Sequence, residues 1–389
     1  MKKVLVVSCY FQKNYGSALQ ALATQMALDK LNIENKTVCY DGLEKAIKSE
    51  KYKYYAKKML NMNVVSGKIG YVKMRLLKKI PFSSLGRNLK ARDVAIKKFE
   101  KRFRLTKSIN SFQELTELAH DYDAVLLGSD QLWLPSNLDA GYYTLNWVPE
   151  GVTRITYATS FGLSKLPQSY YPMVAAFIGK IDQLSVREQT GVKIIEDVCG
   201  RKAELVCDPT ILFTGEEWRT AVAKKTSVVG KYIFCYFLGD NPEQRAFVKR
   251  LKAETGYKIV AILHLNVYVK SDRHFADEEI YEADSADFLN LIRNAEYVCT
   301  DSFHATVFSI LNEKRFFTFR RFKESYSLST NSRLDTLLNQ LSLRRRILTG
   351  QEDVAEMARS AIMYDDVNQK IADMRQHGWD YLEKALEKV

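Results

Sequence analysis

The sequence predicts an α/β protein with two domains of similar size. Its 389 residues are more than one hydrophobic core usually holds. Short apolar segments alternate with helical patterns, and this alternation occurs in two sets along the chain. Continuous apolar runs are typical of strands that are buried on both faces of a parallel sheet. An apolar content of 46% is enough to build two such cores.

The first domain is expected at residues 1–200. Its strands are predicted at residues 3–9, 37–40, 122–127, 153–158 and 183–186. The alternation stops at residues 45–104, where a basic, aromatic-rich segment predicts a helical insertion. Interleaved Tyr and Lys residues can bind nucleic acid, but the segment has no recognisable nucleic-acid-binding fold. A solvated or membrane-apposed helical subdomain is therefore the favoured interpretation, with no nucleic-acid partner.

The second domain is expected at residues 201–350. A strand at residues 204–207, closed by Asp208 and Pro209, is predicted to bridge the two halves. The strands that follow are predicted at residues 231–238, 258–263, 295–299 and 315–318. Residues 351–389 have a helical pattern throughout, and we expect these helices to pack across both domains.

Charge and cysteine content restrict the partners and the compartment. The formal net charge of +12 predicts an anionic partner, such as a phosphorylated lipid or polymer. The six cysteines have no CxxC or metal-ligand spacing, which predicts buried thiols in a reducing compartment and no metal site. The apolar run after Met1 is short and reads as a strand rather than a signal peptide. A cytoplasmic protein, with peripheral contact at the inner face of the membrane as an option, is the expectation.

The turn at residues 300–304 is the strongest candidate for a functional site. It lies between a predicted buried strand and a predicted helix that begins at Ala305. A helix amino terminus at the carboxyl end of a strand favours an anion, and His304 would lie beside it. The alternative is structural, because Asp301 and Ser302 are also good helix caps.

Two turns of the first domain carry further candidates. Asn14 and Gly16 suit a tight turn with positive φ after the first strand, and Ser17 suits a helix cap. In the turn at residues 128–133, Gly128 would let the backbone approach a ligand. Trp133 would form a wall for a sugar ring, or would only anchor the loop.

Arg187 follows the strand at residues 183–186. Its guanidinium has the geometry to bind a phosphate or a carboxylate. The alternative is an ion pair with Glu188 or with another acid.

Five motifs in a fixed order resemble those of one family. They are Asn14-Tyr15-Gly16-Ser17, Gly128-Ser129-Asp130-Gln131-Leu132-Trp133, Ser185-Val186-Arg187-Glu188, Cys207-Asp208-Pro209-Thr210 and Thr300-Asp301-Ser302-Phe303-His304. From about residue 3 to about residue 340, the chain resembles the polysaccharide pyruvyl transferases. The resemblance implies two Rossmann-like domains in a GT-B-like arrangement. It also implies transfer of pyruvate from phosphoenolpyruvate to a sugar, with formation of a cyclic ketal.

The resemblance assigns roles to these residues. His304 is the expected catalytic residue, because imidazole can donate and accept protons near neutral pH. Phosphoenolpyruvate carries a phosphate and a carboxylate, so its site requires cations, which Arg187, Arg320, Arg321 and Arg333 can supply. Asp301 and Ser302 are the other expected donor-binding residues. The expected acceptor-binding residues are Asn14, Gly16, Ser17, Gly128, Ser129, Asp130 and Trp133. Phosphoenolpyruvate acts as a co-substrate, and no metal or other cofactor is required.

Ser302 is a departure from the family pattern. The position two before the histidine is commonly an arginine that contacts the donor, so Arg320, Arg321 or Arg333 would have to supply the missing cation. A GT-B glycosyltransferase with a nucleotide-sugar donor is therefore one alternative. A non-catalytic glycan-binding protein on the same scaffold is another. The acceptor is expected to be a saccharide, with a lipid-linked form as an option, and nothing indicates the oligomeric state.

Overall fold

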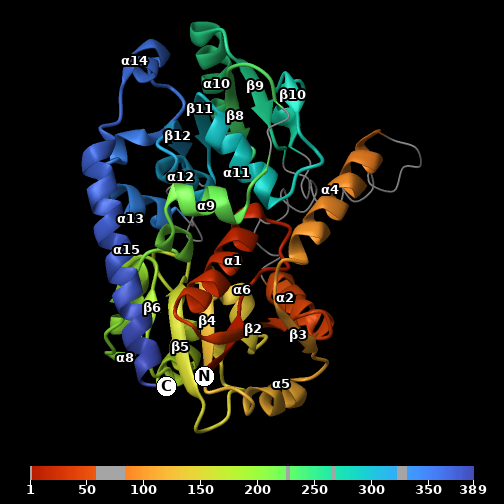
Figure 1. Ribbon diagram of the computed structural model, residues 1–389, viewed down its shortest axis with the longest axis vertical. Helices are drawn as coiled ribbons and strands as arrows, with labels where there is room; N and C mark the ends of the chain where they lie inside the picture. Colours follow the sequence, from red (N-terminus) through yellow and green to blue (C-terminus); the bar gives the residue numbers. More distant parts are fainter. Residues whose placement is uncertain (1, 58–83, 225–227, 264–268, 322–330) are drawn as a thin grey trace.

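Two parallel β-sheets with helices packed around them form the protein, as the sequence predicts. The computed structural model describes residues 2–57, 84–224, 228–263, 269–321 and 331–389. One sheet lies in the lower half of Figure 1 and the other in the upper half. Residues 58–83, the middle of the predicted insertion, lie outside the described residues.

The first sheet has the strand order β3-β2-β1-β4-β5-β6-β7, and every pairing is parallel. This is the order of a Rossmann fold. The strands are β1 (Lys3–Val7), β2 (Glu34–Cys39), β3 (Leu105–Ser108), β4 (Ala124–Asp130), β5 (Thr153–Thr159), β6 (Ser185–Val186) and β7 (Glu204–Leu205). β7 belongs to this sheet, so the predicted boundary at residue 200 falls too early in the chain.

The second sheet repeats the same topology, with the order β10-β9-β8-β11-β12-β13 and parallel pairings throughout. Its strands are β8 (Tyr232–Tyr236), β9 (Lys258–Ala261), β10 (Glu278–Glu279), β11 (Tyr297–Thr300), β12 (Arg315–Phe319) and β13 (Ile347–Leu348). The two sheets together form the GT-B-like pair of Rossmann-like domains that the sequence predicts.

Helices cover both sheets and connect their strands. Those of the first domain are α1 (Tyr15–Lys30), α5 (Phe112–Ala119), α6 (Pro135–Leu138), α7 (Tyr171–Ile178) and α8 (Gln189–Cys199). Those that follow are α9 (Gly215–Ala221), α10 (Pro242–Thr255), α11 (Ser285–Asn294), α12 (Phe303–Leu311), α13 (Ser332–Gln340), α14 (Val354–Arg359) and α15 (Tyr364–Glu387). Among the described residues, none of the helices is both long enough and apolar enough to cross a bilayer.

Two described helices belong to the insertion. α2 (Glu44–Lys57) packs against α6 of the first domain. α4 (Ser84–Glu100) extends alongside the junction of the two domains in Figure 1. Arg92 of α4 donates hydrogen bonds to the carbonyl oxygens of Leu263, at 3.0 Å, and Tyr281, at 3.3 Å. The insertion therefore contacts both domains.

α15 runs along one side of both domains (Figure 1). Near its end, the hydroxyl of Tyr381 donates to the carbonyl oxygen of Thr156 in the first domain, at 2.9 Å. Near its start, the hydroxyl of Tyr364 donates to the carbonyl oxygen of Lys314 in the second domain, at 2.6 Å. These contacts hold the two domains together opposite the insertion.

Each sheet reverses its strand order at its centre, between β1 and β4 in the first and between β8 and β11 in the second. Ligands of open α/β sheets bind at the carboxyl ends of the strands beside this reversal. The turns after β1, β4, β8 and β11 therefore mark where a site is expected.

Candidate active site

The turn after β1 presents Asn14 and Ser17. Asn14 is the cap of α1, and its side-chain oxygen accepts hydrogen bonds from the N–H groups of Gly16, at 3.0 Å, and Ser17, at 3.3 Å. α1 begins at Tyr15, earlier than predicted, so Asn14 rather than Ser17 is the cap. The expected positive φ is also wrong, because Asn14 has a φ of −136° and Gly16 lies within the helix.

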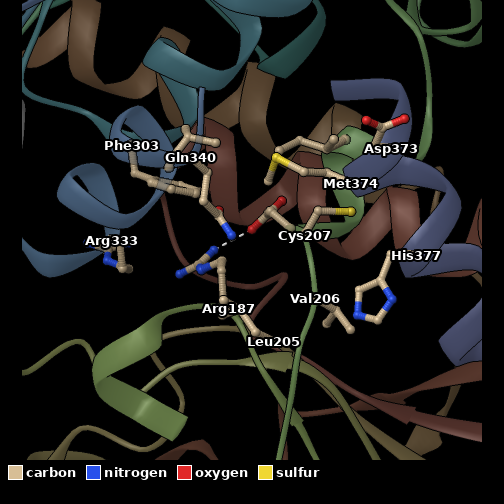
Figure 2. Close-up of a pocket in the computed structure, with 13 residues that line it drawn as sticks. Arg187, Leu205, Val206, Cys207, Phe303, Arg333, Gln340, Asp373, Met374 and His377 are labelled. Atoms are coloured by element: carbon tan, nitrogen blue, oxygen red, sulfur yellow. Dashed lines mark hydrogen bonds and ion pairs between the residues drawn. The ribbon is translucent and has the colours of Figure 1, made fainter. Parts of the chain in front are cut away.

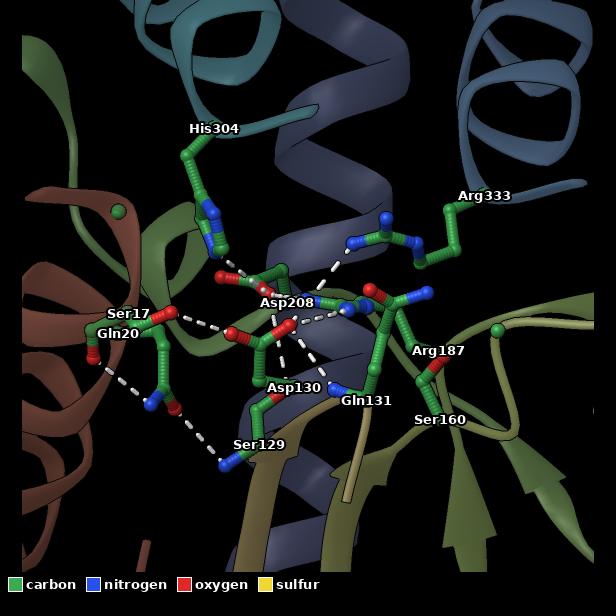
Figure 3. A network of polar contacts seen from close by, with 12 residues as sticks. Ser17, Gln20, Ser129, Asp130, Gln131, Ser160, Arg187, Asp208, His304 and Arg333 are labelled. Carbon is green, nitrogen blue, oxygen red and sulfur yellow. Dashed lines mark hydrogen bonds and ion pairs between the residues drawn. The ribbon is translucent and has the colours of Figure 1, made fainter. Parts of the chain in front are cut away.

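Asp130, at the end of β4, accepts hydrogen bonds and ion pairs from several elements (Figure 3). The hydroxyl of Ser17 donates to its Oδ2 at 2.7 Å. Its Oδ1 lies 3.2 Å from Nη2 of Arg187 and 3.8 Å from Nη1 of Arg333. Burial alone would raise the pKa of Asp130, but the charges of Arg187 and His304 hold that pKa well below its usual range. Asp130 is therefore a carboxylate at neutral pH.

Arg187 is bound between two carboxylates. One terminal nitrogen pairs with Asp208 and the other with Asp130, and the side chain is only 2% exposed. Burial opposes ionisation of Asp208 as well, but Arg187 and His304 hold its pKa well below the usual range. The sequence predicts Arg187 as a donor ligand, with an ion pair as the alternative. The structure shows the ion pair.

His304 lies in the first turn of α12, after the cap Ser302, whose hydroxyl accepts from the N–H of Ala305 at 3.4 Å. It is 5% exposed and points toward the carboxylate cluster (Figure 3). Its Nε2 lies 3.5 Å from Oδ2 of Asp208, which gives electrostatic attraction rather than a well-directed hydrogen bond. Within the described residues this nitrogen has no hydrogen-bond partner, so it is available to a ligand.

Arg333 of α13 is buried beside the same cluster. Its guanidinium lies 5.4 Å from the ring centre of Phe303, and that of Arg187 lies 4.6 Å from it. Burial and the nearby charge of Arg187 lower the pKa of Arg333 to about 9. Arg333 is therefore still a cation at neutral pH, although its nearest ion-pair contact, Asp130, is 3.8 Å away. Such a weakly paired cation suits an anionic ligand.

The remaining donor candidates are Arg321, which lies beside His304, and Asp301 and Arg320, whose carboxylate and guanidinium are held in other contacts. Arg321 lines a cavity with His304, and its Nη2 donates to the carbonyl oxygen of Asp301 at 3.2 Å. The carboxylate of Asp301 accepts from the N–H groups of Leu238, at 2.7 Å, and Gly239, at 2.8 Å. Asp301 thus holds the turn after β8. Arg320 pairs with Asp335 at 2.7 Å.

Two connected spaces lie between the domains. The first, of about 130 Å³, is lined by polar and charged side chains that include Asn14, Ser17, Asp130, Ser302, His304, Arg321 and Arg333. We call it the inner cavity. The second, of about 600 Å³, shares Asn14 and Arg321 with it and is also lined by Phe11, Tyr40, Tyr143 and Tyr236. We call it the aromatic cleft.

A third cavity, of about 240 Å³, is lined by Arg187, Asp208 and residues of α15, which include Met374 and His377 (Figure 2). It shares Phe303 and Arg333 with the inner cavity. Among these three spaces, His304 lines only the inner cavity.

Three predicted acceptor residues are buried away from the cavities. Trp133 is 0% exposed, packs on Phe161 and donates its Nε1–H to the carbonyl oxygen of Tyr143 at 3.1 Å. The sugar-wall role is therefore wrong, and the residue anchors the loop. Gly128 leaves room for the backbone of β5 rather than for a ligand, since a Cβ there would lie 2.1 Å from the carbonyl oxygen of Tyr157. Ser129 is also fully buried and donates to the carbonyl oxygen of Ala158 at 2.6 Å.

The sequence did not indicate two residues of the site, Asp208 and Lys51. Asp208 follows a strand, as Asp130 does, but its position before a proline suggested only a turn. Lys51 lies in the basic insertion and lines the inner cavity and the aromatic cleft. Within the described part of the chain, no three His, Cys, Asp or Glu side chains are grouped as metal ligands.

Comparison with family models decides the identity. The model described as polysaccharide pyruvyl transferase matches residues 14–321. The chain belongs to this family. The matched region contains Asn14, Ser17, Asp130 and His304, and the family's name implies a saccharide acceptor. Comparison with curated proteins found no match.

Comparison with solved structures found similar proteins at low sequence identity. UDP-GlcNAc 2-epimerase from Neisseria meningitidis is 13% identical, with a TM-score of 0.47 and 100% of both chains covered. S. aureus MnaA is 13% identical, with a TM-score of 0.48 and coverage of 99% of this chain and 91% of MnaA. The E. coli heptosyltransferase WaaC is 14% identical, with a TM-score of 0.40 and coverage of 96% and 99%.

Proposed function

We propose that this protein moves pyruvate from phosphoenolpyruvate to a saccharide and forms a cyclic ketal. The observation that carries the proposal is the composition of the inner cavity. It combines His304, whose Nε2 has no hydrogen-bond partner among the described residues, with the guanidinium groups of Arg321 and Arg333. This is a proton-transfer group beside two cations, which suits an anionic enol substrate.

The donor would bind between Arg333, Arg321 and the amino end of α12. Phosphoenolpyruvate carries a phosphate and a carboxylate, and guanidinium groups bind both. Ser302, Phe303 and His304 all line the cavity, so the positive end of the α12 dipole faces it. Ser302 contributes a hydroxyl where the family commonly has an arginine.

His304 would carry the protons of the reaction. Protonation of C3 of the enol makes C2 electrophilic, and a sugar hydroxyl adds to C2 as its proton returns to the imidazole. The bond between C2 and the phosphate oxygen then breaks, a second hydroxyl closes the ring, and its proton leaves with the phosphate. Asp208, 3.5 Å from Nε2, would stabilise the protonated imidazole. Asp208 is itself held as a carboxylate by Arg187.

The acceptor would bind in the aromatic cleft. Phe11, Tyr40 and Tyr143 line it, and rings of this kind pack against the apolar faces of sugars. The cleft is adjacent to the inner cavity, since both spaces are lined by Asn14 and Arg321. The basic helix α2 also lines the cleft, which favours a phosphorylated or lipid-linked acceptor at a cytoplasmic membrane surface.

The test is a transfer assay with phosphoenolpyruvate and a panel of saccharides, free and as lipid diphosphates. Phosphate release and the ketal product would be measured together, the product by mass spectrometry. We expect product with wild type and a rate lower by about 10²–10⁴-fold for His304→Ala, the usual contribution of general acid–base catalysis. The exposed His120 provides the control His120→Ala, which should keep the full rate. A full rate for His304→Ala would contradict the proposal.

A further inference from the structure

The lysines of helix α2 differ in their environment. Lys48 pairs with Glu44 and Lys53 pairs with Glu50, and these are exposed ion pairs along the helix. Lys51 is partly buried and donates to Oδ1 of Asn137 at 3.1 Å. It lines both the inner cavity and the aromatic cleft. One lysine of this exposed basic helix thus lies at the junction of the two spaces.

Lys51 makes no ion pair with any of the described carboxylates. Asp130 lines the same cavity, but its oxygens are occupied by Ser17 and Arg187. Burial lowers the pKa of Lys51. Removing an ammonium from water without a counter-charge is costly, and an anionic ligand would offset that cost.

The neighbours of Lys51 indicate where this anion lies. Arg321 and Arg333 line the same inner cavity, so Lys51 extends a group of cations that begins in the second domain. Lys51 reaches it from the first domain, through the insertion.

We infer that Lys51 contacts the substrate: its ammonium binds the phosphate of the donor at the mouth of the inner cavity. This inference rests on the proposed function and identifies one more residue of that site. A cation on the leaving phosphate also stabilises the charge that develops as the bond to C2 breaks. The insertion is then part of the donor site as well as of the acceptor cleft.

Calorimetric titration with phosphoenolpyruvate tests the inference on wild type, Lys51→Met, Lys51→Gln and Lys51→Arg. Lys53→Met is the matched control, since Lys53 is on the same helix, 63% exposed and paired with Glu50. We expect Lys51→Met and Lys51→Gln to weaken binding by about 10- to 100-fold, as for a lost charge-assisted hydrogen bond. Lys51→Arg, which keeps the charge, should bind within a few-fold of wild type, and Lys53→Met should be unchanged. Lys51→Gln keeps a donor to Asn137, so the test holds if Lys51→Met does not fold.

The outcomes separate this inference from the proposed function. If wild type does not bind phosphoenolpyruvate, both are wrong. If wild type binds it and the two neutral variants bind equally well, only the role of Lys51 is wrong. Unchanged donor affinity with a raised KM for the saccharide would place Lys51 in the acceptor site and would also overturn the inference.

Discussion

Gly16 of the first domain lies directly against the imidazole of His304 in the second. A Cβ at Gly16 would lie 2.3 Å from both Cγ and Nδ1 of His304, which is closer than such atoms approach. Glycine is thus required here by the close approach of the other domain. The orientation of the expected catalytic residue is set partly by a helix of the opposite domain.

We predict that Gly16→Ala lowers kcat with little loss of stability. The added methyl group must displace the imidazole, and a displacement of about 1 Å can cost roughly 10²-fold in rate. Gly179→Ala is the control, because Gly179 is exposed and ends α7 in a right-handed conformation. Steady-state kinetics and urea unfolding of both variants would check this. A wild-type kcat for Gly16→Ala would show that the contact does not position His304.

We predict that Asp208→Asn destabilises the fold by about 3–5 kcal/mol, the usual cost of removing one partner of a buried ion pair. The side chains of Arg187 and Asp208 are 2% and 0% exposed, so the guanidinium stays in the core with Asp130 as its remaining ion-pair partner. Asp335→Asn breaks the partly exposed pair with Arg320 and should cost about 0–1 kcal/mol. The measurement is urea unfolding at neutral pH. Equal, small effects would mean that the buried pair contributes no more than the exposed one.

Glu188 gives a pH dependence of stability. It is fully buried, its Oε1 accepts from Ser160 and Gly162, and burial raises its pKa although Arg187 opposes this. A carboxyl with a raised folded pKa binds more protons in the folded state. The free energy of unfolding therefore decreases as pH rises from the pKa of Glu188 in the unfolded chain, about 4.3, through its higher pKa in the folded protein.

We expect Glu188→Gln to remove this loss. The free energy of unfolding of the variant, minus that of wild type, should increase between about pH 4.5 and pH 8, the range above the unfolded pKa. Urea unfolding at several pH values within this range measures the difference. A difference that stays constant or decreases with pH would contradict a raised pKa at Glu188.

Trp133→Phe should lower stability without changing acceptor binding. The substitution leaves the carbonyl oxygen of Tyr143 without its donor in the core, at a cost of about 1–3 kcal/mol. Because the ring is buried against Phe161 and Phe177, KM for the saccharide should stay at the wild-type value. A raised KM at unchanged stability would favour the sugar-wall role that the sequence suggests.

The sequence predicts the central strands well because each is a run of apolar residues. Val4, Leu5, Val6 and Val7 of β1 are all fully buried, and so are the apolar residues of β4. Of the four edge strands, β7 was predicted, whereas β3, β10 and β13 were not. β10 consists of Glu278 and Glu279 alone, and two polar residues show no periodicity.

The candidate site could be predicted only in part. His304, Asn14 and Asp130 lie where polar residues follow strands, and the structure brings them together. The contact of Gly16 with His304 joins the two domains, and the pair of Arg187 and Asp208 joins the ends of two neighbouring strands. Neither contact has a local sequence pattern, so neither was predictable. Lys51 was missed because one inward lysine in a polar helix resembles its exposed neighbours.

The most direct test of the donor assignment is calorimetry of wild type, Arg333→Met and Arg320→Met with phosphoenolpyruvate and a panel of nucleotide sugars. Our account predicts that wild type binds phosphoenolpyruvate, that Arg333→Met binds it at least about tenfold more weakly, and that Arg320→Met, whose arginine pairs with Asp335, binds it normally. Binding of a nucleotide sugar and not of phosphoenolpyruvate by the wild-type protein would contradict the account and favour glycosyl transfer.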